Sequence, residues 1–160
     1  MLAVRDKRAD DNGRLRALWT DHFGSPVVVA RGRKHDPSKL SGFIAEEAGS
    51  LVGAVTFLRE EDEIEVITLD SVTENRGVAT ALLEAVAAFA RAQGVWRLCL
   101  VTTNDNIRAI RFYQKRGWNL CAFYRDAVAG ARKLKPEIPS TGAEGIPIRH
   151  EIEFELIIAS

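Results

Sequence analysis

Hydrophobic positions in the middle of the chain follow two different periods. Residues 64–69 and 95–101 are short apolar runs, which is typical of strands covered on both faces. Between them, residues 78–89 place an apolar side chain every three or four positions, and Gly94 is suited to the left-handed conformation that ends many helices. Strand, helix and strand with short links predict a right-handed crossover between two parallel strands.

The same order of elements continues towards the carboxyl end. Asn104–Asn106 can cap a helix over residues 107–116, Gly117 closes it, and residues 118–124 return as a strand. The remaining segments are interpreted in the same way: strands at 2–4, 27–30, 43–47, 51–58 and 148–158, a hairpin turn at Gly49-Ser50, a helix capped by Asp10–Asp11 and ended by Ser25-Pro26, a helix at 126–134, and loops at 31–37 and 135–146.

The last predicted strand, residues 148–158, alternates between a mainly apolar face, which consists of Ile148, His150, Ile152, Phe154 and Leu156, and a polar face. We expect the polar set to lie on an exposed face, because alternation of period two is typical of a half-exposed strand: Arg149, Glu151, Glu153 and Glu155. An exposed terminal strand can pair with a second chain, so a homodimer is one expected assembly.

Composition narrows the classes of function. The 160 residues carry 22 Lys and Arg against 22 Asp and Glu, so there is no net charge to attract nucleic acid. No apolar stretch is long enough to span a membrane, and the charged first residues have no signal-peptide core, so we expect a cytoplasmic protein of one domain. Cys99 and Cys121 are expected as reduced, buried thiols, and the scattered His22, His35 and His150 indicate no metal site.

The turn after residues 64–69 has the features of an anion site. Residues 70–80 connect a strand directly to a helix, whose first amides have no partner and whose dipole adds partial positive charge. Gly77 and Ala79 leave room beside the backbone, and Arg76 adds a full charge. Neither GxxxxGK[ST] nor GxGxxG is present, so two common phosphate loops are excluded. On the next predicted helix, Asn106, Ala109 and Tyr113 share one face.

With these two motifs the chain resembles the GNAT superfamily of N-acetyltransferases. Residues 74–79, ENRGVA, align with the R/Q-x-x-G-x-G/A turn, with Glu74 where the family usually has Arg or Gln. Residues 106–118, NIRAIRFYQKRGW, align throughout with N-x-x-A-x-x-[LF]-Y-x-x-x-G-[FW]. The resemblance implies an α/β fold, a mixed sheet of about six to seven strands with helices on both faces. It implies one N-acetyltransferase domain over residues 1–160, with its cofactor-binding core at about 64–124.

The resemblance also implies acetyl-CoA as cosubstrate, no metal, and a small-molecule or protein amine as acceptor. Tyr113 is then expected near the thioester sulfur, where a phenol can protonate the leaving thiolate. Glu63, Glu65 and Asp70 are candidates for the base that deprotonates the amine, and Glu65 is the residue we select. The cofactor-binding residues implied by the motifs are Leu69, Arg76, Gly77, Val78, Ala79, Thr80 and Asn106.

Two alternatives remain from sequence alone. The chain can be a catalytically inactive CoA-binding or interaction module of the same fold, which the Glu74 departure supports. A regulatory partner can also dock at the proline- and glycine-rich loop.

Overall fold

The computed structural model describes residues 1–72 and 77–158, which form a seven-stranded sheet and a separate hairpin. The sheet strands are β1 Leu2–Asp6, β4 Ser41–Glu47, β5 Ser50–Arg59, β6 Glu63–Ser71, β7 Arg97–Thr103, β8 Asn119–Tyr124 and β9 Glu151–Ile157. They lie in the order β1-β4-β5-β6-β7-β9-β8, and every neighbouring pair is antiparallel except β6 and β7. The prediction of a mixed sheet and of a parallel crossover is therefore confirmed.

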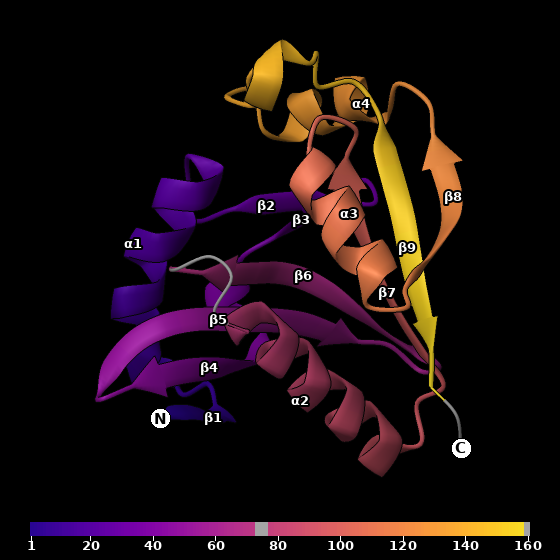
Figure 1. Ribbon diagram of the computed structural model, residues 1–160. Coiled ribbons are helices and arrows are strands. Elements are labelled where there is room, and N and C mark those ends of the chain that lie inside the picture. The colour runs from indigo at the N-terminus through magenta and orange to yellow at the C-terminus, as the bar shows by residue number, and fades with distance from the viewer. Residues whose placement is uncertain (73–76, 159–160) are drawn as a thin grey trace.

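Helices cover both faces of this sheet (Figure 1). The α-helices of the described residues are α1 Asn12–Phe23, α2 Val78–Gln93, α3 Ile107–Lys115 and α4 Ala127–Leu134. Successive strand residues point to opposite faces, so Ile44 and Ala54 meet Leu15 and Trp19 of α1, while Val55 joins the larger core with α2 and α3. Within the described residues, no helix is both long and apolar enough to cross a membrane.

The expected Asp cap of α1 is wrong in its detail. Asp11 stands at the N-cap position, but its side chain makes no cap hydrogen bond. It accepts instead from the guanidinium of Arg5 at 2.8 and 3.0 Å and from the backbone N–H of Arg8 at 2.7 Å. A nearly buried carboxylate gains more from a bidentate arginine than from a helix amide, so Asp11 joins β1 to the start of α1.

The segment predicted as a loop at 31–37 contains a strand. β2, Val28–Ala30, and β3, Arg33–His35, pair antiparallel around the two-residue turn Arg31-Gly32. Both turn residues have positive φ, 52° and 74°, as a two-residue hairpin of this kind requires. The sequence did not indicate β3, because its two exposed residues, Arg33 and Lys34, are cationic and the run has no apolar side chain typical of a strand.

The interpretation of residues 148–158 as a half-exposed edge is wrong. β9 lies between β7 and β8 and pairs with both, so neither of its edges is available to a second chain. Glu151 and Glu153 are 5% and 4% exposed. Alternation identified the two faces of the strand correctly, but the face that carries Glu151 and Glu153 is also covered at these two residues.

Two smaller predictions are also wrong. Cys121 is exposed, whereas Cys99 is buried as expected, and both thiols are free. The β4–β5 turn consists of Ala48 and Gly49 rather than Gly49-Ser50, and both have positive φ.

Candidate active site

The sheet opens at its centre because β6 and β7 diverge. They pair over three residues each, from Glu63 with Arg97 to Glu65 with Cys99. Beyond Glu65, β6 continues beside β5 and β7 continues beside β9 (Figure 1). In the part of the chain that the structure describes, no strand covers the edge of β6 that faces β7 over residues 66–70. Backbone groups on such an edge can bind an extended ligand.

α2 begins beside this opening. Gly77 precedes it with φ of 74°, and a helix leaves its first amides without intrahelical partners. A Cβ on Gly53 of β5 would lie 2.5 Å from Val78 Cγ1 and 2.7 Å from the carbonyl oxygen of Asp70. Glycine at position 53 therefore allows the first turn of α2 to approach the end of β6 closely.

One part of the predicted anion site cannot be located. Residues 73–76, and with them the predicted contact of Arg76 and the Glu74 departure, lie outside the described residues. Residues 77–80 do lie at the start of α2, where the motif places them.

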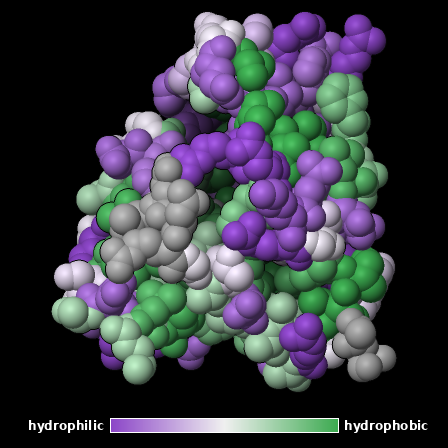
Figure 2. All heavy atoms as spheres, viewed as in Figure 1, coloured by the Kyte–Doolittle hydropathy of each residue, from purple (hydrophilic) through white to green (hydrophobic). Residues whose placement is uncertain are grey.

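Several predicted site residues meet in one cavity of about 410 Å³ between the end of β6, the first turn of α2 and α3. Leu69, Ala79 and Tyr113 all line it. Figure 2 shows this side of the molecule hollowed near its centre, with hydrophilic side chains gathered beside the hollow. Among the described residues, the lining consists of Leu69, Ser71, Ala79, Arg108, Ala109, Arg111, Phe112, Tyr113, Lys115 and Arg116.

The cavity has a strongly cationic wall. Arg108, Arg111, Lys115 and Arg116 of the α3 region line it, and no carboxylate is among the lining residues that belong to the described ranges 1–72 and 77–158. Four positive charges around one cavity favour a polyanionic ligand. Sequence reasoning overlooked this wall, although positions 108, 111 and 115 are spaced to share one helix face.

Arg116 also connects the cavity to α2. Its Nε donates to Thr80 Oγ1 at 2.8 Å, and its guanidinium lies 3.8 Å above the centre of the Phe112 ring. The motif predicts a direct contact between Asn106 and the cofactor, but the structure gives Asn106 another role. It caps α3 by accepting from the N–H of Ala109 at 3.2 Å and is not among the cavity-lining residues.

Tyr113 is almost completely buried at 8% exposure. Its ring packs against Trp118 and Phe154, with ring centres 5.6 Å apart in both pairs. Burial raises the pKa of the Tyr113 phenol well above its ordinary value, and the negative charge of Asp70 raises it further. The phenol therefore stays protonated throughout the neutral range and can act only as a proton donor there.

Asp70 lies next to the end of β6 and is 2% exposed. Its Oδ1 lies 2.6 Å from Nδ1 of His22 on α1, while its buried Oδ2 has no partner among the described residues. Burial raises the pKa of Asp70 to about 6, although the hydrogen bond to His22 acts in the opposite direction. His22, which the sequence presented as an isolated histidine, is therefore paired with a predicted site residue.

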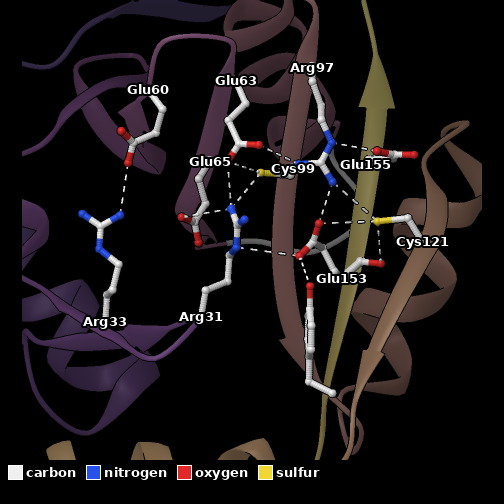
Figure 3. Close-up of polar contacts among 11 residues, drawn as sticks. Arg31, Arg33, Glu60, Glu63, Glu65, Arg97, Cys99, Cys121, Glu153 and Glu155 are labelled. Carbon is white, nitrogen blue, oxygen red and sulfur yellow. Dashed lines mark hydrogen bonds and ion pairs between the residues drawn. The ribbon is translucent and has the colours of Figure 1, made fainter.

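Glu65 lies at the closed end of the opening, within a group of carboxylates and arginines (Figure 3). Its Oε1 is 3.6 Å from Arg31, and burial raises the pKa of Glu65 to about 7. Arg31 also lies 2.9 Å from Glu63 and 3.7 Å from Glu153. Glu65 can thus bind a proton near neutrality, but a structural cation already occupies one side of it.

A second cavity, of about 480 Å³, lies between the β2–β3 turn, β8 and α4. Arg31 and Gly32, from the segment predicted as a loop at 31–37, line it together with Glu151, whereas no residue of the loop predicted at 135–146 does. Among the described residues there is no group of three or more His, Cys, Asp or Glu side chains that could hold a metal ion.

Comparisons with known proteins agree with this geometry. The model of the Acetyltransferase (GNAT) family matches residues 7–118. The chain is 43% identical over 137 residues to Bacillus subtilis (strain 168) YxbD, described as uncharacterized, covering 85% of this chain and 86% of that protein. The IAA acetyltransferase from Bacillus cereus ATCC 14579 superimposes with a TM-score of 0.75 at 16% identity, covering 98% of this chain and 99% of the other.

A further structural neighbour contains the expected cosubstrate. A GNAT family acetyltransferase from Elizabethkingia anophelis, with acetyl-CoA bound, has a TM-score of 0.68 at 14% identity and covers 98% of this chain and 97% of its own. At such identities the structural likeness concerns the fold. Because the family model matches well over half of the residues, the chain belongs to the GNAT acetyltransferase family.

Proposed function

We propose that this protein moves an acetyl group from acetyl-CoA directly to a primary amine of a small molecule or a protein. The observation that carries the proposal is the cavity of about 410 Å³, because it combines a protonated phenol, the open edge of β6 and a cationic helix. Acetyl-CoA has matching parts: a thioester, an extended amide arm and several phosphates.

Each part of acetyl-CoA has a partner in this arrangement. The pyrophosphate would bind the amides at the start of α2, residues 77–80, and the pantetheine arm would pair with β6 at Leu69. The cations of α3 would attract the phosphate groups. Asn106 would act through its cap of α3, which holds the helix carrying Tyr113, as well as through any contact of its own with the cofactor.

In the transfer step the amine nitrogen attacks the thioester carbonyl carbon, and the carbon–sulfur bond breaks. The leaving thiolate needs a proton, since the free thiol has a pKa of roughly 8.5. Tyr113 would supply it, because its own proton is retained at neutral pH. The role of base expected for Glu65 stays a prediction, supported by its raised pKa of about 7.

Calorimetry with acetyl-CoA and release of free CoA thiol with a panel of amines test the proposal. Saturable binding together with amine-dependent thiol release is expected. Binding without release for every amine would support the inactive CoA-binding module instead. Absence of binding at millimolar acetyl-CoA would refute both.

The Tyr113→Phe variant tests the proton donor. We expect kcat to fall by roughly 10²- to 10⁴-fold, as for loss of general acid catalysis, while acetyl-CoA affinity changes little. Tyr124→Phe is the matched control, since Tyr124 is the other tyrosine of the chain and its hydroxyl donates to Glu153 outside the cavity. Unchanged turnover of Tyr113→Phe would remove the phenol from the mechanism.

A further inference from the structure

The pair formed by His22 and Asp70 joins the interior of the protein to its surface. Asp70 has a side chain 1% exposed, whereas the His22 ring is 33% exposed on the last turn of α1. The two are 2.6 Å apart although 48 residues separate them along the chain. An imidazole held on a buried carboxylate and open to solvent on its other side is suited to carrying protons.

The pair also lies beside the cavity that contains Tyr113. Leu69 and Ser71, the residues on either side of Asp70, line that cavity, while the Asp70 side chain points to the other face of the sheet, towards α1. Asp70 is close enough for its charge to act on the Tyr113 phenol. The proton donor of the proposed reaction and this carboxylate–imidazole pair are therefore neighbours at the open edge of β6.

The hydrogen bond fixes which nitrogen of His22 can accept a proton. With Asp70 ionised, the shared proton lies on Nδ1, and Nε2 has a lone pair. Nε2 has no hydrogen-bond partner within the described ranges 1–72 and 77–158.

We propose that Nε2 of His22 removes the proton from the acceptor ammonium, with Asp70 as the positioning residue that holds the imidazole. This inference rests on the proposed acetyl transfer. His22 takes one proton from the ammonium and passes it to solvent. The neutral amine then forms the carbon–nitrogen bond as the carbon–sulfur electron pair moves to sulfur. Tyr113 protonates the sulfur and regains a proton from the new amide nitrogen, so the reaction releases one proton in total.

The geometry favours this pair over Glu65. Glu65 lies where β6 is still paired with β7, and Arg31 contacts it. Asp70 lies five residues further along, where the edge of β6 is open, and only an imidazole contacts its carboxyl group among the described residues. From α3, the Tyr113 phenol is the titratable group on which the charge of Asp70 acts.

The test uses His22→Asn, whose amide can still donate to Asp70 from the Nδ1 position but has no basic nitrogen. With an amine identified by the panel, kcat/KM at pH 7 should fall by roughly 10²- to 10³-fold. With a β,β,β-trifluorinated analogue of that amine, which is largely neutral at pH 7, the variant should lose less than about threefold, because no ammonium proton must be removed. Asp70→Asn should show the same dependence on the amine, with a smaller loss.

Equal losses of His22→Asn on both amines, or no loss on either, would overturn the proposal. A loss specific to the cationic amine in Glu65→Gln but absent in His22→Asn would assign the base to Glu65 instead. Nitrogen-15 NMR of labelled histidine provides a readout without turnover: for the neutral imidazole of His22 we expect the Nδ1–H tautomer and its loss in Asp70→Asn, and a wild-type Nε2–H tautomer would refute the assignment. Failure of the proposed function itself is distinguishable, since the wild-type protein would then release no thiol with any amine.

Discussion

Replacement of Arg97 by methionine tests how the ion pairs between side chains of β6, β7 and β9 contribute to stability. Arg97 donates to Glu63 at 2.8 Å, to Glu153 at 2.5 Å and to Glu155 at 2.7 Å, and its side chain is 13% exposed (Figure 3). Removing one partner of a buried ion pair costs roughly 3–5 kcal/mol. For a protein with a typical unfolding free energy of roughly 5–15 kcal/mol, this loss is large. Arg97→Met should therefore be destabilised by about 3–5 kcal/mol in urea unfolding at pH 7.5.

The pH dependence gives the prediction a second check. Burial acts to raise the pKa values of Glu63 and Glu153, but their hydrogen bonds with Arg97 and other donors outweigh it, so both lie below the ordinary value. A carboxyl group with a lowered pKa stabilises the fold at pH values above the pKa that it has in the unfolded chain. This contribution disappears as the pH falls through the pKa that it has in the folded protein. The difference between wild type and Arg97→Met should thus shrink from pH 7.5 to pH 4.

Arg33→Met is the matched control for this variant. Its pair with Glu60 spans 3.1 Å, but the two side chains are 59% and 44% exposed, so the loss should be roughly 0–1 kcal/mol. The reasoning would be refuted if Arg97→Met cost no more than this control at pH 7.5, or if its loss grew as the pH fell.

Three further substitutions test the supports of the site. Gly53→Ala places a methyl group 2.5 Å from Val78, so α2 should shift at a cost of roughly 1–3 kcal/mol and acetyl-CoA should bind more weakly in calorimetry; an unchanged Kd would contradict the close approach. Asn106→Ala removes the cap bond to Ala109 and should lower stability by roughly 1 kcal/mol in thermal unfolding, with Asn106→Asp recovering most of it. Lys135→Met removes two hydrogen bonds to the segment after α1, so limited proteolysis at residues 24–27 should become faster, and equal rates would show that the contact does not hold that segment.

Elements governed by local chemistry could be predicted closely from the sequence. α2 has an apolar stripe and ends at Gly94 with φ of 71°, both of which depend on neighbouring residues alone. The Asn106 cap of α3 is likewise local. The hairpin of β2 and β3 was missed because its turn consists of Arg31 and Gly32, and the positive φ of an arginine has no clear sequence signal.

Spatial neighbours of distant segments could not be predicted in the same way. The alternation in β9 shows which residues share a face, but it does not say which strands lie on either side. The burial of Glu151 and Glu153 therefore depends on the β2–β3 turn and on β7 and β8. No periodicity in the sequence specifies that these elements lie beside β9. The negative charge of Glu153 was interpreted as a sign of solvent exposure. The two arginines that pair with it in the interior, Arg31 and Arg97, are far away in sequence.

The candidate site likewise combines residues that local motifs predict with a contact between distant segments that they do not. The motifs predict that Leu69, Ala79 and Tyr113 belong to one site, and the three residues line one cavity, since the place of each follows directly from its own strand or helix. The contact between His22 and Asp70 requires α1 to lie across the end of β6, and nothing near either residue indicates the other.

The insertion of β9 between β7 and β8 has a consequence for how the chain folds during synthesis. β7 and β8 are translated first, yet they do not pair with each other. That half of the sheet must wait for residues 151–157, and until then its strands expose backbone groups that favour aggregation. The nascent protein should therefore depend on chaperones longest at this half, while the β1, β4, β5 and β6 half can form before translation is complete.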